Sequence, residues 1–96
     1  RTEEVLRLAL QLAERDELPN AQGPLREIVQ AWDDKKFLLY VLSDHSKESE
    51  IRTSLLKLAA YAEQNDKPLF YGEAAYLDVL LDDLRDMDRP TIHNIL

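Results

Sequence analysis

The stretch YGEAAYLDVLLDDLRDMD, residues 71–88, decides the fold of this 96-residue chain. Its large apolar side chains recur at steps of three and four residues, which is the period of one helix face: Leu77, Leu80, Leu81, Leu84 and Met87. Aspartates occupy the remaining face: Asp78, Asp82, Asp83 and Asp86. The stretch therefore predicts a helix that packs on one side and is strongly negative on the other.

The same three-and-four spacing recurs upstream, and prolines and glycines stand between the periodic segments. We expect a single all-α domain over residues 1–96. Its four main helices should lie near residues 3–17, 24–42, 46–65 and 72–88. A short fifth helix should follow Pro90. Because the connections are short, neighbouring helices should be antiparallel, which gives a four-helix bundle.

The second helix has one ambiguous point, at Asp33-Asp34-Lys35-Lys36. Either one helix runs through to residue 42, or it breaks and restarts at Asp33 or Asp34. The run FLLYVL, residues 37–42, also fits a buried strand, since periodicity does not decide for six residues. We favour helix, because no other segment is a candidate strand and a lone strand would leave its backbone groups unpaired.

The apolar stripes predict a core with at least two members from each main helix. In the first helix, Thr2 is expected to be the N-cap residue, with two acidic residues after it that suit the helix dipole. The expected core residues are Leu8, Leu12, Ile28, Trp32, Leu39, Ile51, Leu55, Leu58, Leu77, Leu80 and Leu84.

Composition argues against several kinds of chemistry. The chain has no cysteine, and its two histidines, His45 and His93, are too few for a usual structural zinc site. Its two glycines, Gly23 and Gly72, form no phosphate-binding loop, and the aspartates lack the spacing of a calcium-binding EF-hand loop. We therefore expect no enzyme activity, no cofactor and no bound metal.

The sequence also bears on location. No apolar run approaches the 18 residues that a membrane helix needs, and the acidic start, Arg1-Thr2-Glu3-Glu4, does not resemble a signal peptide. We expect a cytoplasmic protein that does not enter a membrane. Because the chain lacks an initiator methionine, we also expect it to be part of something longer.

The net charge of −7 disfavours nucleic acid and anionic membranes, and it favours a basic protein as partner. We expect an interaction or regulatory domain that binds a basic partner or a second copy of itself as a homodimer. The aspartates would steer the partner, and apolar side chains would anchor it. The residues expected at this surface are Asp78, Asp82, Asp83, Asp86, Phe70, Tyr71, Ile92 and Ile95.

Three other interpretations of the same residues stay open. One is an immunity-type protein that neutralises a cationic toxin or bacteriocin with the acidic face. Another is a nucleic-acid-associated regulator that uses Lys35 and Lys36, the one run of basic residues. The third is a solvated helix face that only keeps the domain soluble.

Overall fold

The computed structural model describes residues 1–35, 45–86 and 94–96, and all the regular secondary structure in these ranges is helical. This confirms the all-α prediction. A short 3-10 helix, η1, follows the first α-helix. In chain order the elements are α1 (Thr2–Glu14), η1 (Leu18–Ala21), α2 (Gln22–Asp34), α4 (His45–Glu63) and α5 (Lys67–Arg85).

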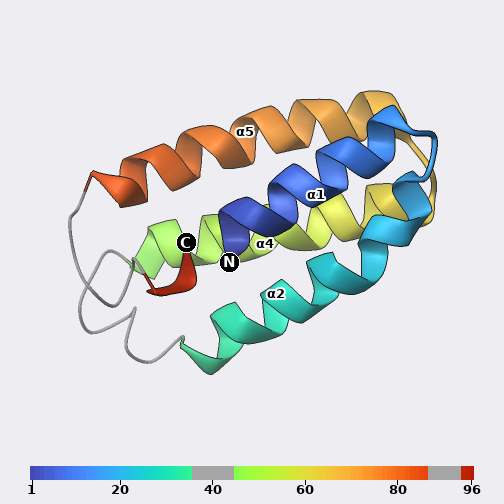
Figure 1. The fold of residues 1–96 in the computed structure, drawn as a ribbon. Helices are drawn as coiled ribbons and strands as arrows, with labels where there is room; N and C mark the ends of the chain where they lie inside the picture. Colours follow the sequence, from blue (N-terminus) through green and yellow to red (C-terminus); the bar gives the residue numbers. More distant parts are fainter. Residues whose placement is uncertain (36–44, 87–93) are drawn as a thin grey trace.

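Helix α4 lies between α2 and α5 and packs against both of them, while α1 contacts α2 and α5 on another side (Figure 1). The four α-helices thereby surround one hydrophobic core. The molecule measures 39 × 22 × 19 Å along its principal axes. None of the helices in the described ranges is long and apolar enough to cross a lipid bilayer.

Most of the expected core is confirmed. Trp32 and Phe70 are the largest side chains that are fully buried. Eight of the expected core residues are buried, namely Ile28, Trp32, Ile51, Leu55, Leu58, Leu77, Leu80 and Leu84. Leu12 is partly buried at the edge of this core, and Leu39 lies outside the described residues.

The prediction for Leu8 is wrong, because its side chain is 42% exposed. Helix α1 buries a different stripe, which consists of Thr2, Leu6, Ala9 and Ala13. Leucine occupies every second position from 6 to 12, so the sequence pattern alone does not show which leucines face inward. The buried stripe of α1 includes a polar residue, Thr2, which is fully buried.

Thr2 does not cap α1 as predicted but lies inside it, where its hydroxyl joins three parts of the chain. The hydroxyl accepts a hydrogen bond from Trp32 Nε1 at 2.9 Å and donates one to the carbonyl oxygen of Ile95. Next to it, the backbone N–H of Glu3 donates to the carbonyl oxygen of Leu96 at 2.6 Å. The last residues of the chain thus satisfy donors that the first turn of a helix leaves unpaired.

Helix α2 ends at Asp34, so the predicted single helix over residues 24–42 is wrong at its C-terminal end. The alternative of a break at Asp33-Asp34 fits the observed end of the helix. Residues 36–42, including the FLLYVL run, lie outside the described residues. At the end of α2, the Asp33 carboxylate accepts a hydrogen bond from Arg52 Nε on α4 at 2.5 Å, which also raises the pKa of Arg52.

Helix α5 begins at Lys67, five residues before the predicted start at residue 72. The preceding turn contains Asn65, whose positive φ of 54° ends the run of α4. The Asp66 carboxylate then accepts a hydrogen bond from the backbone N–H of Leu69 at 3.2 Å and caps α5. Of the expected fifth helix, the structure describes Asn94 and Ile95 as helical, and the rest lies outside the described ranges.

Candidate functional site

Helix α5 carries the candidate site, because its two faces differ sharply. One face is buried against the core through Phe70, Ala74, Leu77, Leu80, Leu81 and Leu84. The other face is exposed and changes in character along the helix. Its N-terminal half is apolar, and its C-terminal half is acidic.

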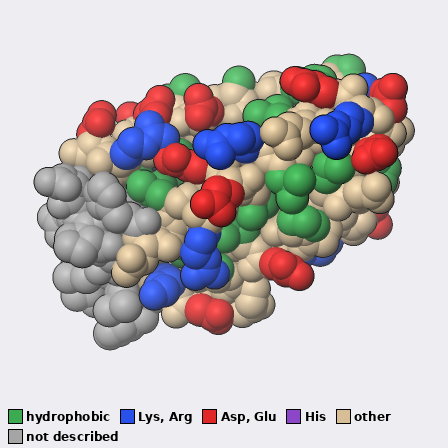
Figure 2. All heavy atoms as spheres, in the orientation of Figure 1, with side chains coloured by type: hydrophobic (Ala, Val, Ile, Leu, Met, Phe, Trp, Pro, Cys, Tyr) green, Lys and Arg blue, Asp and Glu red, His purple; other side chains and the backbone are tan. Residues whose placement is uncertain are grey.

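The acidic half of α5 consists of Asp78, Asp82, Asp83 and Asp86, all of which are exposed. Red side chains follow the upper edge of the molecule in Figure 2, over the C-terminal part of α5. All four predicted acidic residues are thus exposed along the C-terminal half of α5.

Ion pairs neutralise part of this acidic half. Arg85 pairs with Asp82 and also with Glu3 of α1, and both carboxylates raise the pKa of Arg85. Asp83 lies 3.4 Å from Lys47 of α4. Asp78 makes no ion pair with any residue in the described ranges, so its charge is available to a partner.

The apolar residues that were expected to contact a partner differ in their exposure. Phe70 and Ile95 are fully buried, so the prediction that they form an exposed contact surface is wrong. Phe70 belongs to the buried stripe of α5 because that helix begins earlier than predicted. Tyr71 is 40% exposed and is available as predicted. Ile92 lies outside the described residues.

Sequence reasoning missed the apolar half of the exposed face. Leu69, Tyr76 and Val79 are large apolar side chains that lie mostly in solvent, and Gly72 is exposed among them. Leu69 was missed because a helix that starts at residue 72 leaves it in a loop, and without Leu69 the remaining positions do not stand out as a face. The signal was nevertheless present, since positions 69, 72, 76 and 79 follow the three-and-four spacing of a second helix face.

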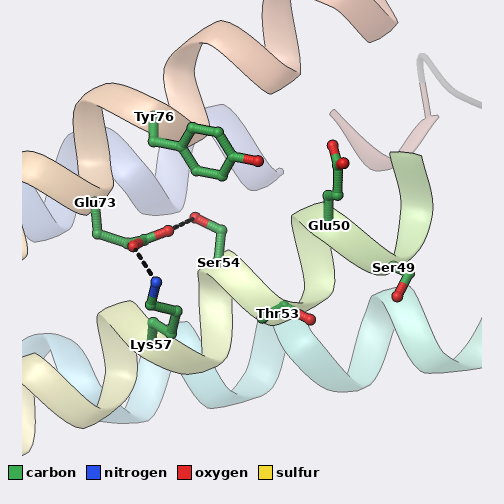
Figure 3. A pocket seen from close by; sticks show the side chains of 7 residues that line it. All are labelled: Ser49, Glu50, Thr53, Ser54, Lys57, Glu73 and Tyr76. Atoms are coloured by element: carbon green, nitrogen blue, oxygen red, sulfur yellow. Dashed lines mark hydrogen bonds and ion pairs between the residues drawn. The ribbon is translucent and has the colours of Figure 1, made fainter. Parts of the chain in front are cut away.

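A pocket of about 470 Å³ lies between α4 and α5 (Figure 3). At one end of the pocket, the carboxylate of Glu73 accepts a hydrogen bond from Ser54 Oγ at 2.7 Å and pairs with Lys57 Nζ at 3.0 Å. The hydrogen bond and the charge of Glu73 raise the pKa of Lys57. Because both carboxylate oxygens have partners, this cluster acts chiefly as a polar connection between the two helices.

The remaining lining of the pocket is polar and exposed. Tyr76 extends over it from α5, and hydroxyl groups of Ser49 and Thr53 and the carboxylate of Glu50 lie along α4 (Figure 3). No group of three or more histidine, aspartate or glutamate residues within the described ranges has a geometry that would hold a metal ion. The Ser54 hydroxyl is hydrogen-bonded to the Glu73 carboxylate, but Ser54 is buried in the contact between α4 and α5, so we assign no reaction to this pair.

A second hollow lies between α1 and α5 and is largely apolar. It has a volume of about 310 Å³ and is lined by Leu6, Leu10, Tyr71, Ala74, Ala75 and Asp78. Beside it, the ion pair between Glu3 and Arg85 bridges the two helices. Asp78 therefore stands at the border between an apolar surface and the acidic half of α5.

Comparison with known proteins gives one match. No curated protein and no solved structure matches the chain. A family model does match it, over residues 3–95, which is nearly the whole chain and takes in α2, α4, α5 and all of α1 except Thr2. The chain therefore belongs to the family described as "Domain of unknown function (DUF4363)".

Proposed function

We propose that this domain is a protein-interaction module of regulatory type that binds a basic partner protein through the acidic half of α5. The observation that carries the proposal is that Asp78, Asp82, Asp83 and Asp86 are all exposed on the C-terminal half of α5 or directly after it. The net charge of −7 adds a long-range attraction for a cationic partner.

The position of these aspartates along α5 supports a role beyond solubility. Carboxylates near the C-terminus of a helix oppose its dipole, at about 0.3–1 kcal/mol each. Lysine or arginine would keep the surface just as soluble and would stabilise the helix. Asp82, Asp83 and Asp86 lie in the last turn of α5 or directly after it, where only Arg85 has the favourable sign.

Two neighbouring features suit a protein partner. Tyr71 and the hollow between α1 and α5 offer apolar contact area directly beside Asp78. Charged residues at the rim of an interface mainly speed association, while buried apolar contacts hold the complex together. Asp78 and Asp86 would contribute most among the aspartates, because neither makes an ion pair within the described ranges that a partner would have to displace.

The test compares two variants with equal net charge. Asp78, Asp82 and Asp86 are changed to lysine in one, and Glu4, Glu14 and Glu27, which are exposed on α1 and α2, are changed to lysine in the other. Each change moves the net charge from −7 to −1, since three reversals add six charges. The variants and the unchanged chain are then used as bait for proteins of the source cells.

We expect basic proteins to be retained by the unchanged chain and by the α1/α2 variant, and lost from the α5 variant. Retention should also weaken with rising salt, because the attraction is between exposed charges. If the α5 variant keeps every partner, the aspartates serve solubility only. A captured toxin whose activity the chain suppresses would identify the immunity-type form of the same function.

We also infer that the four helices form an antiparallel bundle. Ion pairs support this arrangement, because each links an early position on one helix with a late position on the next: Arg26 with Glu63, Lys47 with Asp83, and Glu3 with Arg85. Carbodiimide cross-linking followed by mass spectrometry should join Lys47 to Asp83 and Lys57 to Glu73. Joining Lys47 to Glu73 instead would contradict this register.

A further inference from the structure

The exposed apolar half of α5 forms a regular seam. Its members are Leu69, Gly72, Tyr76 and Val79, separated by three, four and three residues. This is the spacing with which the a and d positions of a heptad line the contact between two paired helices. Leu69, Tyr76 and Val79 are 51%, 47% and 58% exposed, so the part of the chain that the structure describes leaves about half of each side chain uncovered.

We propose that the seam is covered by α5 of a second copy of this chain, running antiparallel. The two-fold axis would pass near residue 74, which lies midway between positions 72 and 76 and also between positions 69 and 79. Leu69 of each copy would then face Val79 of the other copy. Gly72 would face Tyr76, so that the missing side chain of one helix receives the ring of the other.

The monomer gives Gly72 no other role. A Cβ atom added at Gly72 would have nothing within 4 Å, so no packing in the monomer requires glycine there. Glycine in the interior of a helix destabilises it by about 0.5–1 kcal/mol relative to alanine. Close approach by another helix, with Tyr76 opposite, would account for this residue.

The distribution of charge selects both the partner and the direction. The four seam residues themselves are uncharged, so direct contact with the seam offers a cationic side chain nothing to pair with, and the exposed Asp78 lies instead at the hollow between α5 and α1. In a parallel pair, the two copies of Asp83 would lie about 8–10 Å apart, at the distance between packed helices. In the antiparallel pair, each Asp83 is nine residues from the axis, and a rise of 1.5 Å per residue puts the two about 27 Å apart.

That separation exceeds the Debye length of about 8 Å at physiological ionic strength, so repulsion between the acidic halves is largely screened. Each acidic half would instead lie beside the amino-terminal end of the other α5, which carries the positive end of the helix dipole. Lys67 adds a positive charge at that end, although it is also paired with Asp16. The arrangement leaves the two acidic halves at opposite ends of the pair.

The size of the seam sets the strength of the dimer. Contact over about three helical turns is much smaller than the roughly 800 Å² per partner of a standard stable interface. The dimer should therefore be reversible, and its population should depend on protein concentration. This inference does not rest on the proposed binding of a basic partner, because self-association is measured with the purified chain alone.

The experiment measures molar mass by sedimentation equilibrium, from about 1 μM to about 1 mM chain. The unchanged chain should rise from its monomer mass of 11.1 kDa toward twice that value. Gly72→Gln places a neutral side chain in the seam, and Gly23→Gln is the matched control, because Gly23 is also helical, exposed and free of neighbours within 4 Å. Gly72→Gln should remain near the monomer mass, and Gly23→Gln should dimerise like the unchanged chain.

Disulfide formation tests the direction, since the chain has no native cysteine. Leu69→Cys and Val79→Cys are prepared as separate variants and mixed under mild oxidation. The antiparallel seam predicts a mixed disulfide that joins position 69 of one copy to position 79 of the other. Predominant joining of position 69 to position 69 would overturn the antiparallel arrangement.

Three other results would overturn the proposal of a second copy. One is a monomer mass at every concentration, which would leave the seam for a different protein. Another is dimerisation of Gly72→Gln as strong as that of the control, which would place the contact elsewhere. The third is loss of helical circular dichroism in Gly72→Gln but not in Gly23→Gln, since the seam would then be needed for folding of the monomer.

Discussion

Replacing Thr2 by valine should destabilise the domain strongly, although the change alters only one buried atom group. Valine keeps the shape of threonine but has no hydroxyl. The change leaves the Nε1–H of Trp32 without its acceptor and the carbonyl oxygen of Ile95 without its donor, in a region where Thr2 and Trp32 are fully buried. Each buried polar group left unpaired costs about 1–3 kcal/mol.

The two groups together predict a loss of about 2–6 kcal/mol in the free energy of unfolding. For a domain of this size, unfolding entropy near the melting temperature is about 0.2 kcal/mol per degree, so the melting temperature should fall by about 10–30 °C. Urea denaturation followed by circular dichroism at 222 nm measures the first quantity, and thermal denaturation measures the second.

Two variants separate the hydrogen bonds from the change in side chain. Thr2→Ser keeps the hydroxyl and loses one methyl group, so we expect a loss of only about 1 kcal/mol. Thr53→Val makes the same change as Thr2→Val at an exposed position of α4, and its effect should stay within about 0.5 kcal/mol. If Thr2→Val is as stable as Thr53→Val, the junction between the two ends of the chain does not contribute to stability, and our account of it is wrong.

Three further results are expected. The hydrogen bond and the charge of Lys67 lower the pKa of Asp16 below its ordinary value of 3.8, so this ion pair stabilises the fold above pH 3.8 and loses its effect as the pH falls through the lowered pKa. Lys67→Gln should return the pKa of Asp16 to the ordinary range, as measured by carbon NMR of its carboxyl group. Ser54→Ala should lower the free energy of unfolding in urea by about 1 kcal/mol, because the Glu73 carboxylate loses the hydrogen bond that the Ser54 hydroxyl donates. An unchanged free energy of unfolding would show that solvent replaces this hydrogen bond. Gly72→Ala should raise the stability of the dilute monomer by about 0.5–1 kcal/mol, and a decrease would mean that an unseen contact in the monomer requires glycine.

The sequence correctly predicts which residues are buried where the apolar residues follow one regular spacing. Ile28 and Trp32 in α2, and Leu77, Leu80 and Leu84 in α5, follow the three-and-four spacing of one helix face, and all five are buried as that spacing predicts. In α1 the leucines stand at every second position, so the same spacing fits more than one face. The buried hydrogen bond of Thr2 joins residues 93 positions apart, and such a contact leaves no periodic trace in the sequence.

The start of α5 was missed for a different reason. Asn65-Asp66-Lys67-Pro68 was interpreted as the end of one helix, whereas Asp66 and Pro68 are also typical of a helix start. This segment both ends one helix and starts the next, since Asn65 ends α4 and Asp66 caps α5. The correct start brings Leu69 and Gly72 into the helix and so creates the seam. The acidic half did not depend on this boundary, because all its residues lie beyond it.

The two ends of the chain meet beside the first turn of α1, where the Glu3 N–H donates to the Leu96 carbonyl oxygen (Figure 1). Any polypeptide joined before residue 1 and after residue 96 would therefore leave the domain at one place. Inserted into another protein, the domain would form a side branch and would not act as a spacer, so it would add little to the distance between the parts that flank it. Tension on those flanking parts would load the Thr2 junction first, before it reached the packed interior of α2, α4 and α5.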